Sequence, residues 1–318
     1  MTPCRICGEA VATETLEVPE LMLGWRESHR YFRCSACGCL QIETIPDDMA
    51  RYYGEGYYSY ALNAAGGWRG RLAACRDHHL VFGGGIVGAL LARAQPISLF
   101  DSLQPLRSWL RPGLRVLDVG CGSGGLVQRL RRIGLDAHGA DPFIKADIHD
   151  GGSLLVRRAQ LDGLDERFDL IMFHHSFEHM PDAAGTLRAA AARLATGGRL
   201  LVRVPLCSSE AFERYREHWV QLDAPRHFYL HTEASLVGLA QRCGFACEQV
   251  LYDSTAFQFW GSEQYRQGLP LRDAKSHAVD PASSPFTPAQ IKAWEVRSRA
   301  LNAARRGDQA AFYLRLST

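Results

Sequence analysis

The chain has 318 residues, of which 47% are hydrophobic and 22% charged, with a formal net charge of +2 at pH 7. This length and composition suit an ordered α/β domain with a small appendage, and they exclude a disordered chain. The net charge says little about partners, but no basic cluster resembles a nucleic-acid-binding arm, and only three of the 36 basic residues are lysines.

The N-terminus, Met1-Thr2-Pro3-Cys4, has neither the basic region nor the apolar region of a secretory signal peptide. We therefore expect a cytoplasmic protein, in which the ten cysteines stay reduced unless a metal ion binds them. Residues 80–91 are the most apolar stretch, but they are too few and too rich in glycine to cross a bilayer. We expect no transmembrane segment.

Two Cys-x-x-Cys-Gly motifs lie near the N-terminus, at residues 4–8 and 34–38. Each motif lets two thiolates reach one ion while the glycine takes the turn behind them. A redox disulfide fits poorly, because redox motifs of this kind come singly and at the start of a helix. Four protein ligands leave no position for water, so we predict a structural zinc ion in a ribbon of residues 1–45. The predicted ligands are Cys4, Cys7, Cys34 and Cys37.

Residues 51–60 contain five tyrosines. One interpretation is a packing patch between the ribbon and the main domain, because a tyrosine ring is apolar with a polar tip. The other is one wall of an acceptor pocket, since aromatic faces suit sugars and ring substrates. Both interpretations remain open at this point.

Residues 68–110 have a helical pattern that glycines 83–85 interrupt and that resumes after Pro96. We expect a last helix over residues 98–110, and we assign residues 46–110 to a helical connector and cap. The apolar part of this segment either covers the sheet or lies on a membrane surface as a peripheral contact, because arginines flank it. We favour the covering helix.

Residues 114–119 form an apolar run that breaks into glycines and resumes with helical spacing at residues 126–132. This pattern predicts a strand, a tight turn and a helix. Glycine permits a positive φ and a close approach of the main chain to a ligand, and the helix directs free N–H groups at that ligand. Gly120, Gly122 and Gly125 also satisfy the dinucleotide pattern, so the turn alone does not exclude a dinucleotide.

Two aspartates narrow the class of ligand. Asp118 precedes the first glycine by two residues, where it can accept hydrogen bonds from the turn or from a ligand ammonium. Asp141 ends a second short strand, residues 136–140, about 20 residues further on, where an acidic side chain can bind both hydroxyls of a ribose. We therefore expect a ligand that contains a nucleoside.

The later elements are typical of a parallel α/β sheet. We predict strands over residues 154–156, 168–173, 199–205, 248–252 and 310–316, and helices over residues 183–195 and 235–243. An insertion of about residues 261–306, with a helix that begins at Pro288, is expected to help cover the pocket. Ligands of parallel sheets bind at the carboxyl ends of strands, so His174 and His175 are expected to contact the ligand.

The run Asp-Val-Gly-Cys-Gly-Ser-Gly at residues 118–124 resembles motif I of the class I S-adenosylmethionine (SAM) methyltransferases. The Phe-Asp-Leu strand at 168–170, Glu-His-x-Pro-Asp at 178–182 and the order of the elements resemble the same family. The resemblance implies an α/β, Rossmann-like sheet of order 3-2-1-4-5-7-6 with an antiparallel last strand, within residues 111–318. It implies SAM as the cofactor. The residues expected to bind it are Asp118, Gly120, Cys121, Gly122, Gly124, Asp141, Pro142, His174 and His175.

The N-terminal cysteine motifs resemble those of methyltransferases that act on activated sugars in the biosynthesis of surface polysaccharides and antibiotics. The sugar C-methyltransferases of this group carry a Glu-His pair after the fifth strand, where this chain has Arg226 before His227. They also have a large additional C-terminal domain. The two differences argue against C-methylation and favour O-methylation.

A sugar hydroxyl is not ionised at pH 7, so its methylation calls for a general base, for which histidine is the usual choice. His227 is the first candidate, because histidines and aromatic residues cluster around it in the sequence. His179, next to Glu178, is the second, although Glu178 could also orient the following helix or bind a divalent metal together with His175 and His179. Tyr229 is the third candidate.

The resulting prediction is SAM-dependent methyl transfer to a small or carrier-linked acceptor, above all a sugar hydroxyl. An RNA methyltransferase whose ribbon grips nucleic acid is a second hypothesis, but arginines and glutamates alternate in the ribbon without a basic stripe. The motifs also allow a sugar C-methyltransferase or a non-catalytic SAM-binding protein. The glycine turn and the histidine-rich segments argue against a non-catalytic protein.

Overall fold

The computed structural model describes residues 3–10, 12–53 and 67–317. By its internal contacts the chain divides into two units. Unit 1 comprises Met1–Tyr53, Phe177–Leu187 and Val204–Phe312, and unit 2 comprises Gly54–Ser176, Arg188–Arg203 and Tyr313–Thr318. The domain limits expected from the sequence, 1–45, 46–110 and 111–318, stay a prediction.

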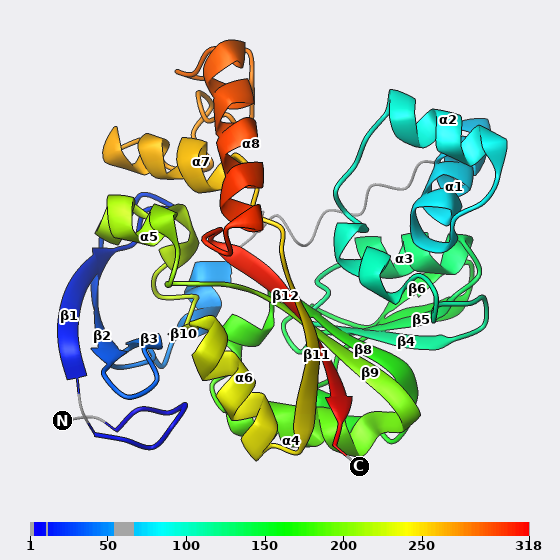
Figure 1. The fold of residues 1–318 in the computed structure, drawn as a ribbon, viewed down its shortest axis with the longest axis horizontal. Helices are drawn as coiled ribbons and strands as arrows, with labels where there is room; N and C mark the ends of the chain where they lie inside the picture. The colour runs from blue at the N-terminus through cyan, green and yellow to red at the C-terminus, as the bar shows by residue number, and fades with distance from the viewer. Residues whose placement is uncertain (1–2, 11, 54–66, 318) are drawn as a thin grey trace. The chain divides into compact units, whose positions relative to one another are not determined.

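The main sheet has eight strands in the order β11-β12-β9-β8-β4-β5-β7-β6 (Figure 1). This order confirms the predicted order 3-2-1-4-5-7-6 and adds one strand, β6, which pairs antiparallel to β7. The central pairs β4–β5, β4–β8, β5–β7 and β8–β9 are parallel. The strands are β4 (Arg115–Val119), β5 (Asp136–Ala140), β6 (Ile148–Asp150), β7 (Ser153–Arg157), β8 (Phe168–His174), β9 (Leu194–Pro205), β11 (Phe245–Tyr252) and β12 (Gln309–Leu316).

Unit 2 carries the glycine turn between β4 and α3 (Gly125–Arg132). Its other helices are α1 (Gly67–Phe82) and α2 (Ile86–Ala94), which pack against each other, and the 3-10 helices η3 (Asp101–Leu106) and η4 (Leu161–Gly163). The predicted interruption is present, because Gly83, Gly84 and Gly85 all have positive φ between α1 and α2. The helix expected over residues 98–110 is only the short η3, which contains Pro105 and so loses a backbone donor.

Unit 1 contains a second sheet of order β1-β2-β3-β10. Strands β1 (Ala12–Pro19), β2 (Ser28–Cys34) and β3 (Leu40–Ile42) form the expected antiparallel ribbon. Strand β10 (Tyr229–Leu230) adds itself antiparallel to β3, which the sequence did not indicate. In Figure 1 strands β1, β2 and β3 are blue, and β10 lies beside β3 although it is far along the sequence.

The helices of unit 1 surround a core that includes the fully buried side chains of Trp219, Phe212 and Phe259. Helix α6 (Glu233–Arg242) begins at a Thr232 capping box, and α8 (Pro288–Ala303) begins at a Thr287 capping box. The start of α8 at Pro288 was predicted. Helix α4 (Ala183–Arg193) has residues in both units. The others are η1 (Met49–Tyr53), η5 (Phe177–His179), α5 (Glu210–Tyr215), η6 (Arg216–His218), η7 (Val220–Leu222) and α7 (Phe257–Arg266).

Candidate active site

The glycine turn of unit 2 has the backbone that its sequence predicts. Gly120, Gly122 and Gly124 have φ of 73°, 56° and 79°, a region that disfavours any residue with a Cβ. A Cβ on Gly120 would lie 2.5 Å from the Cβ of Ser176. The Ser176 hydroxyl donates to the Val119 carbonyl at 2.6 Å, so the residue that crowds Gly120 is itself held in place. Only glycine fits at this position.

Asp141, at the end of β5, is bonded to the glycine turn. Its Oδ2 accepts from the Gly122 N–H at 2.8 Å, and its Oδ1 accepts from the Phe143 N–H at 2.8 Å. Burial raises the pKa of Asp141, and these two backbone donors oppose the rise. Each carboxylate oxygen can accept a further hydrogen bond, so a ribose can still be bound here.

Asp118 is 4% exposed, and its Oδ1 has no hydrogen-bond partner among the described residues. Burial, and secondarily the charge of Asp141, raises the pKa of Asp118 to about 8. A buried carboxylate oxygen without a donor is costly, and a cationic ligand group would relieve that cost. The turn and its two aspartates therefore fit SAM, which presents an ammonium, a sulfonium and a ribose.

The remaining residues expected to bind SAM also lie in unit 2. His174 ends β8, and its buried Nε2 has no partner among the described residues. Burial lowers the pKa of His174 to about 3, with smaller contributions from Arg203 and His175, so the ring is neutral. His175 has a φ of 51°, and its N–H donates to the Arg203 carbonyl at 2.9 Å. Burial raises the pKa of the Cys121 thiol well above its usual range.

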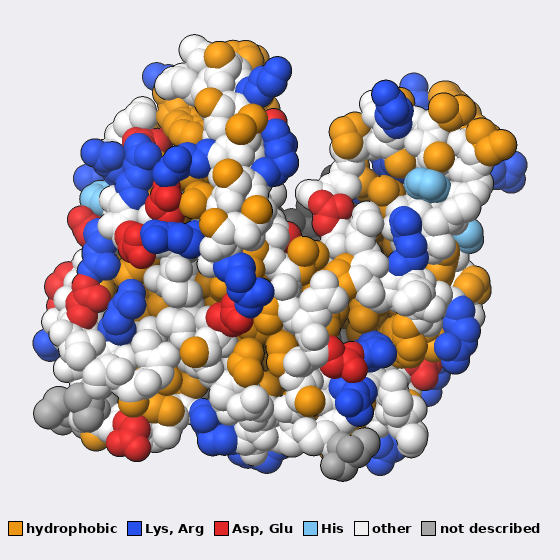
Figure 2. All heavy atoms as spheres, in the orientation of Figure 1, with side chains coloured by type: hydrophobic (Ala, Val, Ile, Leu, Met, Phe, Trp, Pro, Cys, Tyr) orange, Lys and Arg blue, Asp and Glu red, His pale blue; other side chains and the backbone are white. Residues whose placement is uncertain are grey.

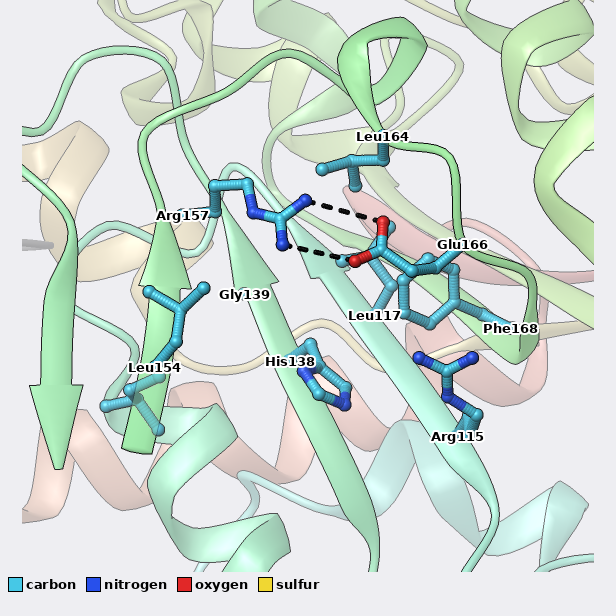
Figure 3. A pocket seen from close by; sticks show the side chains of 10 residues that line it. Arg115, Leu117, His138, Gly139, Leu154, Arg157, Leu164, Glu166 and Phe168 are labelled. Carbon is cyan, nitrogen blue, oxygen red and sulfur yellow. Dashed lines mark hydrogen bonds and ion pairs between the residues drawn. The ribbon is translucent and has the colours of Figure 1, made fainter. Parts of the chain in front are cut away.

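A separate pocket in unit 2 is lined by residues of β4, β5 and β7 and of the segment 164–168. Figure 3 shows the Arg157–Glu166 ion pair above Leu117 and His138 in this pocket, with an Nη2–Oε1 distance of 3.1 Å. None of the residues expected to bind SAM or to act in catalysis lines it. This pocket is therefore separate from the residues expected to bind SAM.

His227, in unit 1, is buried at 6% exposure. Its Nδ1 lies 2.7 Å from the Gln221 carbonyl oxygen, which can only accept, so Nδ1 carries the proton and Nε2 has the lone pair. Two carboxylate oxygens, Glu178 Oε1 and Asp223 Oδ2, lie 3.9 Å and 3.8 Å from Nε2. Both distances exceed a hydrogen bond, yet both charges are near enough to stabilise a protonated ring.

His179 lies beside His227, with ring centroids 4.8 Å apart. Its Nδ1 is 2.7 Å from the Arg226 carbonyl oxygen and 3.0 Å from the Tyr53 hydroxyl. Burial, and then the neighbouring His227, lowers the pKa of His179 to about 4. His179 is therefore neutral at pH 7 and a weak base.

Tyr229 is fully buried in β10, and its hydroxyl donates to the Pro181 carbonyl at 2.5 Å. Burial raises the pKa of Tyr229 to about 12. Asp182 accepts from the Gly185 N–H at 2.8 Å and so caps the start of α4. Among the described residues, the metal-capable group around Glu178 and His179 includes His227 and not His175.

The four cysteines of the N-terminal motifs come together in unit 1, with all four Sγ atoms within 4.8 Å of one another. The Cys4–Cys37 and Cys7–Cys34 Sγ distances are 3.7 Å and 3.5 Å, near the roughly 3.8 Å expected between thiolates around a tetrahedral zinc ion. Gly8 and Gly38 have positive φ in the turns behind the thiols, as predicted. The donor set and its spacing fit zinc.

Two expectations concern the connector. Of the tyrosine-rich segment, only residues 51–53 lie within the described part of the chain, so residues 54–60 fall outside it.

Apolar residues of α1 and α2 are exposed, with Ile86 at 82% and Leu90 at 64%, and Figure 2 shows hydrophobic side chains among basic ones over these helices. Within the described residues no helix is long and apolar enough to cross a membrane. A peripheral membrane contact stays a prediction.

The sequence did not indicate the residues that surround His227. Asp223 and Arg226 are close in sequence, and their charges are the only signal that could have marked them. Arg226 is fully buried and bonds to Asp223 at 2.6 Å and to Glu20 at 2.8 Å. Burial opposes ionisation of Asp223, but Arg226 outweighs it, and the pKa of Asp223 falls below its usual range. Arg226, which differs from the Glu-His pair of the sugar C-methyltransferases, thus has a structural role.

Comparisons with known proteins agree with this geometry. The family described as a methyltransferase domain matches residues 91–250, half of the chain. Ubiquinone biosynthesis O-methyltransferase from Bradyrhizobium diazoefficiens is 36% identical over 99 residues, which cover 28% of this chain and 39% of that protein. The protein of the same name from Hahella chejuensis is 39% identical over 98 residues, covering 27% and 41%.

The chain thus spans about two fifths of the length of the curated relatives that it matches. Among solved structures, a SAM-dependent methyltransferase from Mesorhizobium loti is 20% identical, with a TM-score of 0.43, covering 67% of this chain and 97% of that chain. The family match over half of the chain, the strand order and the glycine turn agree with one another. The chain belongs to the methyltransferase-domain family and has a Rossmann-like fold.

Proposed function

We propose that this methyltransferase transfers the methyl group of SAM to a hydroxyl of a small or carrier-linked acceptor, above all a sugar hydroxyl, with His227 as the general base. One observation carries the assignment of the base. The Gln221 carbonyl, 2.7 Å from Nδ1, fixes the tautomer of His227 and leaves its Nε2 ready to accept a proton.

The groups around Nε2 support this role. Glu178 and Asp223 place negative charge 3.9 Å and 3.8 Å from Nε2, which stabilises the imidazolium that forms when the acceptor hydroxyl gives up its proton. The acceptor oxygen then forms a bond to the methyl carbon as the bond from that carbon to sulfur breaks. SAM would supply the methyl group and a neutral thioether as the leaving group. Asp118 and Asp141 would bind its amino group and its ribose.

His179 is the weaker candidate for the base. Its pKa of about 4 makes it a poor proton acceptor at pH 7, and the Arg226 carbonyl holds its Nδ1. Tyr229 is less suitable still, because its hydroxyl donates to Pro181 and its pKa is about 12. We assign both residues to the packing around His227.

The test compares His227→Asn with His218→Asn, a histidine of the preceding turn that faces Glu217 instead. Transfer of labelled methyl from SAM to a cell extract should fall about 10²- to 10⁴-fold in His227→Asn and stay near wild type in His218→Asn. Calorimetry with S-adenosylhomocysteine (SAH) should give the same affinity for all three proteins. Undiminished transfer by His227→Asn would remove His227 from the reaction.

A phenolic hydroxyl is the second candidate acceptor, because the relatives named above are O-methyltransferases of ubiquinone biosynthesis. A phenol has a pKa near that of free tyrosine, about 10, and needs less help from a base than a sugar hydroxyl does. Label that extracts into organic solvent and stays with an aromatic ring would favour the phenol. Label in the saccharide fraction would favour the sugar.

We also propose that Cys4, Cys7, Cys34 and Cys37 bind one structural zinc ion. The four converging sulfurs support this proposal, and so does the Gln41 side-chain amide, which donates to Cys4 Sγ at 3.0 Å and steadies a thiolate there. Elemental analysis should give one zinc ion per chain, and Cys34→Ser should lose it. The same zinc content in Cys34→Ser and wild type would contradict the assignment.

A further inference from the structure

The N-terminal ribbon and the His227 loop are far apart in sequence and in contact in unit 1. We define the ribbon as described residues 3–10 and 12–45, and the His227 loop as residues 223–230. Strand β10, at the end of this loop, extends the ribbon sheet, where Tyr229 pairs with Gln41 and Leu230 pairs with Leu40. The ribbon sheet therefore continues from β3 into β10, a strand of the His227 loop.

Three more consecutive residues of the loop are bonded to the ribbon. The Arg226 guanidinium donates to Glu20 at 2.8 Å, and both side chains are fully buried. The Tyr31 hydroxyl donates to the His227 carbonyl at 2.8 Å, and the Ile42 N–H donates to the Phe228 carbonyl at 3.1 Å. With the β3–β10 pairing, each residue from 226 to 230 has a partner in the ribbon.

Glu20 is itself held rigidly. It lies in the turn between β1 and β2, where its carboxylate accepts from the Leu23 N–H at 2.9 Å and the Trp25 N–H at 3.1 Å. Its third partner is Arg226, whose Nη2 also donates to Asp223 and whose carbonyl accepts from His179. Arg226 therefore connects Glu20 to Asp223 and His179, which both lie close to the His227 ring.

The cysteine cluster connects to the same strand. Gln41, fully buried in β3, donates to Cys4 Sγ at 3.0 Å and accepts from the Arg5 N–H at 3.0 Å. The Thr232 hydroxyl, just beyond β10, donates to the Cys37 carbonyl at 3.0 Å. The Cys37 turn thus contacts the segment beyond β10 directly, and Cys4 is connected to Tyr229 through Gln41.

We propose that the ribbon is the scaffold of the His227 loop and that Glu20 and Tyr31 are positioning residues for methyl transfer. This inference rests on His227 being the base, as proposed above. It assigns the zinc ribbon an internal function, which is to hold the base in register, in place of the grip on nucleic acid considered from the sequence.

The experiment uses Glu20→Gln, which keeps the size of the side chain and removes its charge, and Tyr31→Phe, which removes one hydroxyl. Glu17→Gln is the matched control, because Glu17 lies in the same ribbon in an exposed pair with Arg30 at 4.0 Å. We expect label transfer from SAM to a cell extract to fall about 10- to 100-fold in Glu20→Gln. Label transfer should fall less in Tyr31→Phe, and in Glu17→Gln it should equal that of the wild type.

Two readouts separate positioning from a general loss of structure. SAH affinity by calorimetry should stay within about twofold of wild type in every variant. Glu20→Gln should also have no further effect on transfer in a His227→Asn background, because a residue that acts through His227 loses its effect once His227 is gone. A Glu20→Gln effect of equal size in both backgrounds would overturn the proposal.

Removal of zinc provides an independent test of the ribbon as a scaffold. Chelation of the wild-type protein should reduce transfer in parallel with zinc content, with SAH affinity again within about twofold. If Glu20→Gln and Tyr31→Phe both transfer methyl groups at the wild-type rate while His227→Asn is inactive, the proposal that the ribbon is a scaffold is wrong. The assignment of His227 as the general base is then unaffected. If His227→Asn is active, the base itself is wrong.

Discussion

The glycine turn and the His227 loop are built from partners at very different distances along the chain. Gly122 bonds to Asp141, 19 residues away, and Val119 bonds to Ser176, 57 residues away. His227 bonds to Tyr31, 196 residues away, and Arg226 bonds to Glu20, 206 residues away. The turn takes its shape from its own glycines, whereas the loop takes its shape from a distant ribbon.

The two regions also differ in how they treat charge. Asp118 is buried with an oxygen that lacks a partner among the described residues, so an ionised Asp118 would be incompletely compensated in the turn. In the loop, Arg226 is matched by Glu20 and Asp223. A buried carboxylate without a partner can be neutralised by a cationic ligand. A buried ion pair that already has its partners instead holds the surrounding structure in place. Three variants of unit 2 test this contrast, and they follow in order of expected effect.

The largest loss of SAH affinity should come from Gly120→Ala. The new Cβ would meet Ser176 at 2.5 Å in a residue whose φ is 73°, so both a clash and backbone strain oppose the bound conformation. We expect SAH affinity to fall about thirtyfold or more by calorimetry. Gly125→Ala is the control, because nothing lies within 4 Å of its added Cβ. Equal affinity in the two variants would mean that the turn does not hold the ligand.

Asp118→Asn should have an intermediate effect on SAH affinity, which should fall, whereas the stability of the ligand-free protein should rise. Because the folded protein raises the Asp118 pKa to about 8 from its ordinary value of 3.8, it keeps a proton that the unfolded chain releases, and stability falls as pH rises through this window. The asparagine removes that pH dependence, so the ligand-free variant should melt higher than wild type at pH 7.

The affinity of Asp118→Asn should move the other way. In the wild type, SAH affinity should rise with pH up to about 8 as Asp118 ionises, and level off above it. The variant should bind about tenfold more weakly at pH 8, without this rise. Calorimetry and thermal melts from pH 5 to about 9 check both statements. Parallel affinity profiles for the two proteins would show that Asp118 does not contact the ligand.

The smallest effect should come from Glu166→Gln, which breaks the ion pair in the pocket of Figure 3. The side chains of Arg157 and Glu166 are 40% and 36% exposed, so the pair contributes about 0.2–1 kcal/mol. SAH affinity should not change. A tenfold loss of affinity would extend the SAM site to this pocket, contrary to its lining.

Local patterns predicted most of unit 2. The glycine turn, β4, β5 and Asp141 follow from residue types within about 25 positions, because a strand, a positive φ and an acid at a strand end are local properties. The sheet order came from the family resemblance and was confirmed. The helix over residues 98–110 was overestimated, since Pro105 limits it to a 3-10 turn.

The surroundings of His227 could not be predicted in this way. Strand β10 has two residues, too few for any alternation, and its existence depends on β3. Arg226 looked like a departure from a Glu-His pair, and its function becomes clear only when Glu20 is found beside it. The roles of Asp118, His174, His227 and the other candidate site residues stay predictions until the experiments above are done.

The buried arginine has a consequence for protein engineering. Arg226 is fully buried, and one of its two carboxylate partners comes from the ribbon. A chimera that receives its ribbon from a relative without the matching acid would strand a cation in the interior, at a cost of about 3–5 kcal/mol. Exchange of N-terminal modules between such enzymes should therefore succeed only when Glu20 and Arg226 are transferred as a pair.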